Sequence, residues 1–144
     1  MAEEMVRYGA GRLSYVVEGP YARKDISAVI IRCPGDINYE TSTLFLRAAT
    51  HAYSEHNHVV VDMGKVDRID STGLGAVVEA SADGREQGLE FMLVNVRERA
   101  AKLLWFIGVT DVLKPYGSIR EALSAEPEGR RRKVLEAVRD GFES

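Results

Sequence analysis

Residues 59–75 have the sequence VVVDMGKVDRIDSTGLG, and the predicted fold class follows from them. The three consecutive valines are typical of a buried strand, and a polar connection follows them. Asp70, Ser71 and Thr72 suit the start of a helix, because their side-chain oxygens accept hydrogen bonds from unpaired backbone N–H groups. The glycines after them add no bulk to the first turn, so another surface can approach its backbone. The stretch therefore predicts a strand, a loop and a helix start.

The rest of the sequence alternates strand and helix patterns. Short alternating or β-branched runs predict strands at residues 13–17, 26–31, 58–63 and 89–94. Apolar spacings of three and four predict helices at residues 39–55, from 72 to glycines near 84 and 88, at 97–107, and from 118. Ser118 and Glu121 have the spacing of a capping box. A turn at Gly19 and Pro20, completed by a polar connection at residues 23–25, should join the first two strands as an antiparallel pair. This order predicts an α/β domain with a mixed sheet.

Length and composition fit an ordinary globular protein. The chain has 144 residues, of which 45% are hydrophobic and 28% charged, and this length predicts about one domain. A net charge of -3 gives no electrostatic reason to bind nucleic acid or anionic lipid. The single cysteine, Cys33, cannot form an internal disulfide or a cysteine-based metal cage. No segment reaches the roughly 20 apolar residues of a membrane span, and residues 1–11 lack the apolar core of a signal peptide. We expect a soluble, cytoplasmic protein.

The last residues form a separate segment. Pro127 and Gly129 divide a predicted domain at 1–125 from a charged extension at 126–144. The extension is predicted to be an extra helix with a narrow apolar stripe made of Val134, Leu135, Val138 and Phe142. This stripe either folds back on the domain or meets a partner. The four consecutive basic residues are too few, and too diluted by acidic neighbours, to predict a nucleic-acid or membrane site.

Enzymatic interpretations of the central motif fail on spacing. A nucleophile elbow needs G-x-S-x-G, and Ile69 stands where the first glycine is required. A dinucleotide fingerprint needs a third glycine where Val78 stands, and no P-loop lysine follows. The three histidines lack zinc-site spacing. We therefore predict no catalytic residue, metal or cofactor. A nucleotide-binding domain built on the two glycines is the alternative from the enzyme class.

The same residues resemble a known family, the STAS domain, and within it the small bacterial anti-sigma factor antagonists. Residues 59–62 followed by 69–75 are close to the family's strand and its D-S-[ST]-G-L-G motif. Residues 35–38 resemble the family's G-E-L-D turn, and residues 108–123 resemble its closing pattern. The resemblance covers about residues 13–123. It implies a non-enzymatic α/β domain whose mixed sheet, of about four to five strands, is flanked by about four helices; the extension adds its extra helix.

The resemblance also implies a switch by phosphorylation. Ser71 occupies the position of the serine that is phosphorylated by a partner kinase, and Thr72 is the less favoured acceptor. The kinase is itself an anti-sigma factor with an ATP-binding fold. Unphosphorylated protein would bind the kinase and release its sigma factor, and phosphorylated protein would not bind until a PP2C-type phosphatase restores it. The alternative is a STAS subunit that regulates another complex, such as a signalling scaffold or a lipid-transport ATPase.

The residues expected to bind the partner surround this serine. They are Asp36, Asn38, Arg68, Ile69, Asp70, Ser71, Thr72, Gly73, Leu74 and Gly75. Asn38 departs from the family's acidic residue, so Asp36 is the only carboxylate of its turn. Phosphorylation adds roughly -1.5 to -2 charges, which a helix N-terminus can hold but which a buried interface must compensate. We therefore expect phosphorylation to weaken binding without changing the fold. The sequence does not determine whether the protein forms a homo-oligomer.

Overall fold

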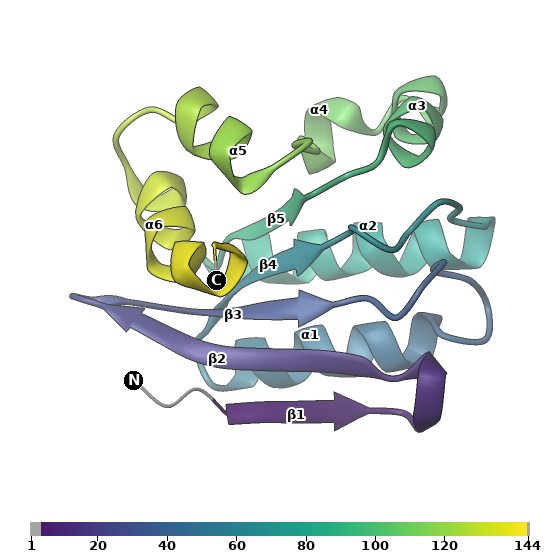
Figure 1. Ribbon diagram of the computed structural model, residues 1–144, viewed down its shortest axis with the longest axis horizontal. Helices are drawn as coiled ribbons and strands as arrows, with labels where there is room; N and C mark the ends of the chain where they lie inside the picture. The colour runs from purple at the N-terminus through teal and green to yellow at the C-terminus, as the bar shows by residue number, and fades with distance from the viewer. Residues whose placement is uncertain (1–3, 144) are drawn as a thin grey trace.

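A five-stranded mixed sheet forms the centre of the computed structural model, which describes residues 4–143 (Figure 1). Its strands lie in chain order: β1 (Glu4–Tyr8), β2 (Tyr15–Arg23), β3 (Ile26–Arg32), β4 (His58–Asp62) and β5 (Phe91–Val94). β1, β2 and β3 pair antiparallel, whereas β3, β4 and β5 pair parallel. The predicted α/β class and mixed sheet are confirmed. Residues 1–3, at which the predicted domain starts, lie outside the described residues.

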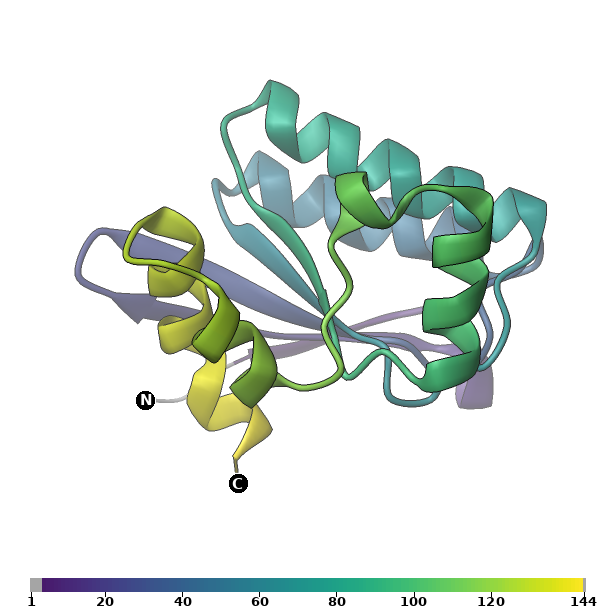
Figure 2. The ribbon, with the colours of Figure 1, turned by 90° about the horizontal axis from the view of Figure 1, so that it is seen from above.

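Helices cover both faces of this sheet (Figure 2). α1 (Ser42–Ser54) and α2 (Ser71–Glu86) lie on one face, and α5 (Ile119–Ala125) and α6 (Arg130–Phe142) lie on the other. α3 (Glu98–Ile107) and the short α4 (Thr110–Leu113) follow β5, and a 3-10 turn at Gly11–Leu13 precedes β2. Within residues 4–143, no helix is both long and apolar enough to cross a membrane.

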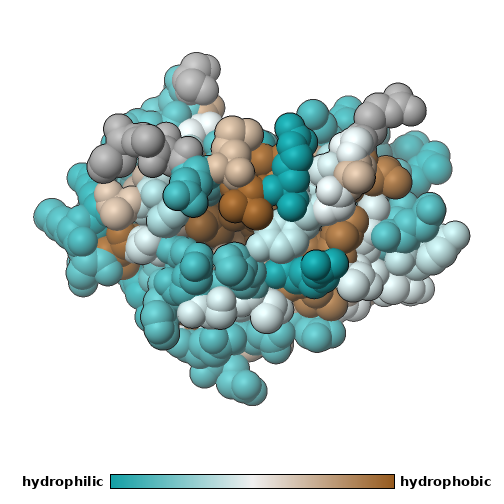
Figure 3. Space-filling model, turned by 90° about the horizontal axis from the view of Figure 1, so that it is seen from below, coloured by the Kyte–Doolittle hydropathy of each residue, from teal (hydrophilic) through white to brown (hydrophobic). Residues whose placement is uncertain are grey.

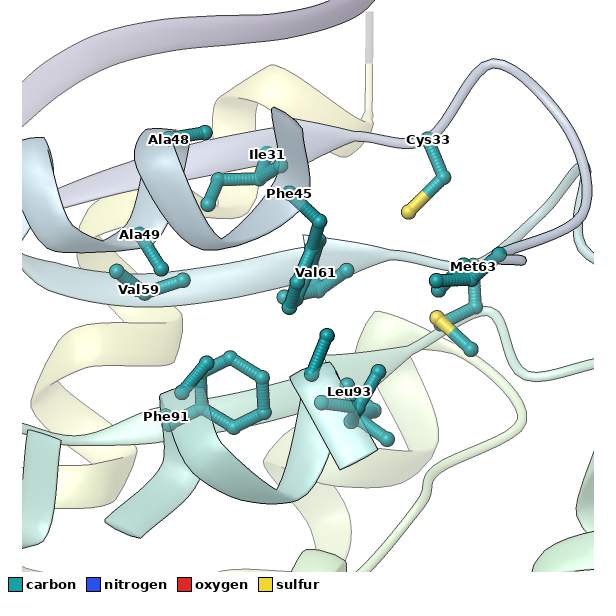
Figure 4. Close-up of a cluster of buried hydrophobic side chains, with 14 of the residues drawn as sticks. Ile31, Cys33, Phe45, Ala48, Ala49, Val59, Val61, Met63, Phe91 and Leu93 are labelled. Atoms are coloured by element: carbon teal, nitrogen blue, oxygen red, sulfur yellow. The ribbon is translucent and has the colours of Figure 1, made fainter. Parts of the chain in front are cut away.

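Strand alternation divides the core into two layers. Val29, Ile31, Val59, Val61 and Leu93 face α1 and α2, and Figure 4 shows several of these side chains around Phe45. The residues between them face the other way and form the second layer with α5 and α6; they include Ala28, Ile30, Val60, Met92 and Val94. Because β4 is buried on both faces, its sequence is a continuous run of valines instead of an alternating pattern.

The predicted turn at Gly19 and Pro20 was wrong. Gly19 and Pro20 lie inside β2, where the pairing with β3 shifts register between Glu18 and Tyr21. A proline cannot donate a ladder hydrogen bond, so a strand accommodates it at such an irregularity. The chain reverses at residues 24–25, within the predicted polar connection, where Lys24 has a φ of 57°. The predicted antiparallel pairing of the two strands is confirmed.

β1 was not predicted, and it forms an edge of the sheet. Its Met5 and Val6 side chains are 61% and 43% exposed, so its apolar pattern is not that of a core strand. Seen from the side of this edge, the surface is mostly hydrophilic, with a few hydrophobic side chains in a hollow near its centre (Figure 3). This strand is defined by its pairing with β2. The sequence of residues 4–8 does not by itself predict that pairing.

Helix boundaries follow local chemistry closely. α3 ends at Gly108, which has the left-handed φ of 92° that favours glycine. Ser118 caps α5 by accepting a hydrogen bond from the Glu121 N–H at 2.9 Å, as predicted. The return bond of the capping box differs, because the Glu121 carboxylate accepts from the N–H of Gly117 at 2.9 Å, one residue earlier. The four-residue α4 was not predicted.

The predicted extra helix exists as α6, and it folds back on the sheet. Val134, Leu135 and Val138 are fully buried in the second core layer. Phe142 lies 5.2 Å from the Arg32 guanidinium carbon, measured to its ring centre, and Arg32 also donates to the carbonyl of Gly141 at 2.7 Å. The apolar stripe is therefore covered within this chain.

Candidate functional site

Asp70 caps α2 and leaves Ser71 as its first helical residue. The Asp70 Oδ1 atom accepts a hydrogen bond from the N–H of Gly73 at 2.7 Å, and its Oδ2 atom accepts from the N–H of Tyr39 at 3.1 Å. Ser71 and Thr72 are exposed, and their hydroxyl groups make no hydrogen bond within residues 4–143. The local structure therefore uses the carboxylate of Asp70 and leaves both hydroxyl groups available.

The turn after β3 is bound to the loop after β4. Ile37 and Ile69 form an isolated parallel bridge, with the Ile37 N–H donating to the Arg68 carbonyl at 3.2 Å. The Asp36 Oδ1 atom accepts from the N–H groups of Asp67 and Arg68, both at 3.0 Å. These bonds hold the two connections together at the ends of two parallel strands, a common position for binding sites in α/β proteins.

Asn38 organises the start of α1. Its Oδ1 atom accepts from the N–H of Glu40 at 3.0 Å and from the N–H of Thr41 at 3.2 Å, which is an Asx turn. An amide oxygen and a carboxylate oxygen can both accept these bonds. The asparagine therefore keeps the geometry of the turn but adds no negative charge to the surface. This turn also explains why α1 begins at Ser42 and not at the predicted residue 39.

The two glycines of the motif have different roles. A Cβ atom at Gly73 would lie 2.1 Å from the carbonyl oxygen of Ile37, so only glycine allows this contact between α2 and the turn. A Cβ atom at Gly75 would meet nothing within 4 Å, and Gly75 is exposed. The close approach that the glycines were expected to permit is thus made at Gly73 by the chain itself.

The residues expected to bind a partner lie in one region but differ in exposure. Arg68, Asp70, Ser71, Thr72 and Gly75 are exposed. Asp36, Asn38 and Leu74 are partly buried, and Ile69 and Gly73 are buried. The exposed residues offer side chains and backbone to another molecule, whereas the buried ones hold the loop and helix in place.

A groove borders this region, and we call it the α3 groove. It has a volume of about 360 Å³ and is lined by Asp67, Arg68, Ile69, Asp70, Arg99 and Leu103. Sequence reasoning missed Arg99 and Leu103 as site residues. From the sequence, Leu103 is only one of the apolar residues whose spacing predicts the helix at 97–107. The packing of α3 beside the β4–α2 loop shows that it lines a surface groove.

The site presents an exposed hydroxyl group at the start of a helix. Ser71 has no hydrogen-bonded general base among the described residues, so nothing there activates its hydroxyl as a nucleophile. Residues 4–143 also contain no group of three metal-ligating side chains. His58 is buried at the other end of β4, where its Nδ1 atom accepts from the N–H of Glu90 at 2.8 Å. An exposed hydroxyl at a helix N-terminus is instead suited to accept a group that another protein delivers.

Comparisons with known proteins agree with this fold. The family model described as the STAS domain matches residues 20–122. A candidate anti-sigma factor antagonist of Thermotoga neapolitana is 30% identical over 114 residues, which are 77% of this chain and 98% of the relative. A crystal structure of a candidate anti-sigma factor antagonist from Thermotoga maritima has a TM-score of 0.61 at 25% identity, and the match covers 67% of this chain and 85% of that one.

A more distant structure supports the fold alone. The anti-sigma factor antagonist SpoIIAA in its unphosphorylated form, a cell fate determinant of Bacillus, has a TM-score of 0.51 at 14% identity. The match covers 94% of this chain and 98% of SpoIIAA. The five-stranded mixed sheet with flanking helices is thus the fold of such antagonists.

Proposed function

Because the chain belongs to the STAS domain family, we propose that it is an anti-sigma factor antagonist whose binding is switched off by phosphorylation of Ser71. The unphosphorylated protein binds an ATP-binding anti-sigma factor serine kinase in the cytoplasm, and the kinase then releases its sigma factor. Phosphorylated protein does not bind. A PP2C-type phosphatase removes the phosphate and restores binding. The protein catalyses no reaction of its own.

One observation carries the proposal, namely the position of Ser71. Its hydroxyl is exposed at the first turn of a 16-residue helix and makes no hydrogen bond within residues 4–143. A kinase can reach such a hydroxyl without unfolding the helix. Thr72 is also exposed, but it lies one residue further into the helix, and Ser71 is the residue next to the capping Asp70.

The expected effect of the phosphate follows from electrostatics. The N-terminus of α2 can hold an anion with its free N–H groups, so the fold is kept. The same dianion beside the Asp70 carboxylate raises the negative charge of the exposed surface by roughly 1.5 to 2 units. A partner that covers Ser71 must then desolvate this charge without a prepared counter-charge, which weakens the complex.

The test compares wild-type protein with Ser71→Ala and Thr72→Ala during incubation with the cognate kinase and ATP. Intact mass spectrometry measures phosphate incorporation, and calorimetry measures complex formation before and after labelling. We expect wild type and Thr72→Ala to gain one phosphate and to lose binding. Ser71→Ala should gain none and should keep binding. Equal labelling of Ser71→Ala and wild type would refute Ser71 as the acceptor.

A charge variant separates the switch from the labelling reaction. Ser71→Asp should raise the Kd for the kinase by about ten-fold or more, because placing like charges in an interface costs kilocalories per mole. Ser124→Asp is the matched control, since Ser124 is exposed on α5, on another part of the molecule. Equal affinities of Ser71→Asp and Ser124→Asp would argue against a charge switch. Recovery of a transporter ATPase as the stable partner would replace the proposed function.

A further inference from the structure

A hollow lies at the outer edge of β5, which is the last strand of the sheet. The end of α2 and the start of α6 flank the chain that enters this strand (Figure 2). The hollow has a volume of about 120 Å³, and its polar lining consists of Ser81, Arg85, Glu90, Arg130 and Arg131. We call it the β5 hollow. It shares no lining residue with the α3 groove, which borders the opposite end of α2.

Three hydrogen-bond donors of the β5 hollow have no acceptor within residues 4–143. Ser81 is only 7% exposed, yet its hydroxyl group makes no hydrogen bond there. Arg85 lies one turn further along the same face of α2, and its guanidinium group has no partner among the described residues. The Nη2 atom of Arg131 is buried without a partner. Buried donors are normally paired, so these groups indicate an acceptor that the described chain does not supply.

The lining of the β5 hollow has an excess of positive charge. It holds three arginines and one carboxylate, that of Glu90. Both oxygen atoms of this carboxylate are occupied, because Oε2 lies 2.7 Å from Arg130 and Oε1 lies 3.1 Å from Arg131. Glu126 is not part of the lining, but it lies 3.2 Å from the Nε atom of Arg131 and neutralises one further charge. Arg85 is then the cation left without a carboxylate, so the hollow favours an anion.

A phosphate group matches these donors better than a carboxylate does. The donors reach the hollow from two elements, Ser81 and Arg85 from α2 and Arg131 from α6. A phosphate presents three acceptor oxygens in different directions, whereas a carboxylate presents two in one plane. Guanidinium groups bind phosphate through paired, charge-assisted hydrogen bonds. The hollow is smaller than the roughly 150 Å³ cavity that holds a benzene molecule, so it suits a ligand of few atoms.

We propose that the β5 hollow is a binding site for a phosphate group, either inorganic phosphate or the phosphate monoester of a small metabolite. Ser81 and Arg85 donate to the group from α2. Arg131 donates through Nη2, the nitrogen that its ion pairs leave free. The bound group joins the end of α2 to the start of α6. The site is independent of the proposed function, because it needs neither a kinase nor a phosphate on Ser71.

Backbone amide shifts of nitrogen-15-labelled protein locate the ligand. Titration with sodium phosphate, at an ionic strength held constant with sodium chloride, should shift the amides of residues 81–91 and 129–132 and leave those of residues 36–41 unchanged. The same titration with glycerol 3-phosphate distinguishes the two sources. Equal or tighter binding of inorganic phosphate identifies the free ion as sufficient, whereas tighter binding of glycerol 3-phosphate identifies a monoester.

Substitutions measure the contribution of each donor. Arg85→Gln should raise the Kd for phosphate by about ten-fold or more, because it removes a hydrogen-bonding cation. Ser81→Ala should raise it by about three-fold, and it should not destabilise the protein, because the lost hydroxyl has no partner among the described residues. Arg47→Gln is the matched control, since Arg47 is exposed on α1, does not line the hollow and has no ion pair within residues 4–143.

A melting experiment separates binding from the general effect of the salt. Phosphate stabilises proteins by exclusion from their surface, and this effect acts on wild type and Arg85→Gln alike. Binding adds to it only where the site is intact, so phosphate should raise the melting temperature of wild type more than that of Arg85→Gln.

Three results would overturn the proposal. The first is the absence of amide shifts around the β5 hollow with both ligands. The second is an equal Kd for phosphate in wild type and Arg85→Gln. The third is an equal rise of the Kd in Arg47→Gln and Arg85→Gln, because the attraction would then be that of positive charge anywhere on the surface.

Discussion

Polar side chains around Ser71 are engaged with the backbone before any partner binds. Asp36 accepts from two N–H groups of the β4–α2 loop, Asn38 accepts from two at the start of α1, and Asp70 joins α2 to Tyr39. Substituting any of them changes the shape of the loop as well as the surface. Ser71 lacks such bonds among the described residues, so its substitution tests binding with little structural effect.

Gly73 and Gly75 offer a matched pair at the residue scale. We expect Gly73→Ala to lower the free energy of unfolding by about 1–3 kcal/mol or more, because the new methyl group overlaps the Ile37 carbonyl at 2.1 Å. Gly75→Ala meets open space in the interior of α2 and should stabilise the protein by about 0.5–1 kcal/mol. Urea denaturation measures both. Equal stabilities of the two variants would contradict the assigned role of Gly73.

At the scale of elements, α6 shows what the spacing of apolar residues predicts and what it leaves open. The stripe predicted from spacing is the face that is buried, but spacing left open whether the sheet or a partner would cover it. Ion pairs also join the start of the helix to the rest of the molecule: Arg130 and Arg131 contact Glu90 at 2.7 Å and 3.1 Å, and Arg131 contacts Glu126 at 3.2 Å. Glu90 lies 40 residues before Arg130, so the sequence did not predict these two pairs, whereas Glu126 lies only five residues before Arg131.

The packing of α6 predicts a large effect of its central residue. Leu135→Ala should lower the free energy of unfolding by about 2–5 kcal/mol, because it removes a fully buried side chain from the second core layer. Lys133→Ala, at an exposed position of the same helix, should change it by less than about 0.5 kcal/mol. Thermal and urea unfolding of both variants provide the measurement. A Leu135→Ala protein as stable as wild type would show that α6 does not dock in solution.

β4 is a strand that its own sequence predicts, whereas β1 is a strand that its own sequence does not predict. β4 is a β-branched run buried on both faces, so its own residues specify it. β1 is an exposed edge strand whose identity depends on pairing with β2, and β2 continues through Gly19 and Pro20 because β3 pairs on both sides of the irregularity. The Gly-Pro sequence therefore predicted a chain reversal at a point where pairing with β3 continues the strand.

For the whole molecule, two buried groups make stability depend on pH. Burial lowers the pKa of His58, the positive charge of Arg130 adds to this, and Glu90 opposes it. Burial alone would raise the pKa of Glu126, but the Tyr116 hydroxyl and Arg131 more than offset this, so the pKa lies below its usual 4.5. Both groups therefore favour the folded state in the form they hold at neutral pH, namely neutral histidine and ionised carboxylate.

The two effects fall in separate pH windows. The contribution of His58 is fully present above its ordinary pKa of 6.5 and is lost as the pH falls from there through the lowered folded-state pKa, because the unfolded chain takes up the proton first. The contribution of Glu126 is present above pH 4.5 and is lost below it. Between pH 7.5 and about 5, the free energy of unfolding should therefore decrease chiefly through His58.

His58→Asn tests this dependence. Its amide oxygen can still accept from the Glu90 N–H, but the side chain does not titrate. Urea titrations at pH 7.5 and 5.5 should show a smaller loss of stability in His58→Asn than in wild type. His56→Asn, at an exposed position with no ion pair within residues 4–143, is the matched control and should lose as much as wild type. An unchanged pH dependence in His58→Asn would show that another group is responsible.

The amino-acid sequence by itself determined the features that depend on near neighbours. Strand β4, the helix start at Asp70 and Ser71, the cap at Ser118 and the apolar stripe of α6 follow from periodicity and hydrogen-bonding capacity within a few residues. Only the tertiary structure decided which distant segments meet. It placed the Ile37 carbonyl against Gly73, α3 beside the β4–α2 loop, and the stripe of α6 on the sheet. Such contacts depend on packing between segments, for which a residue's neighbours in sequence carry no signal.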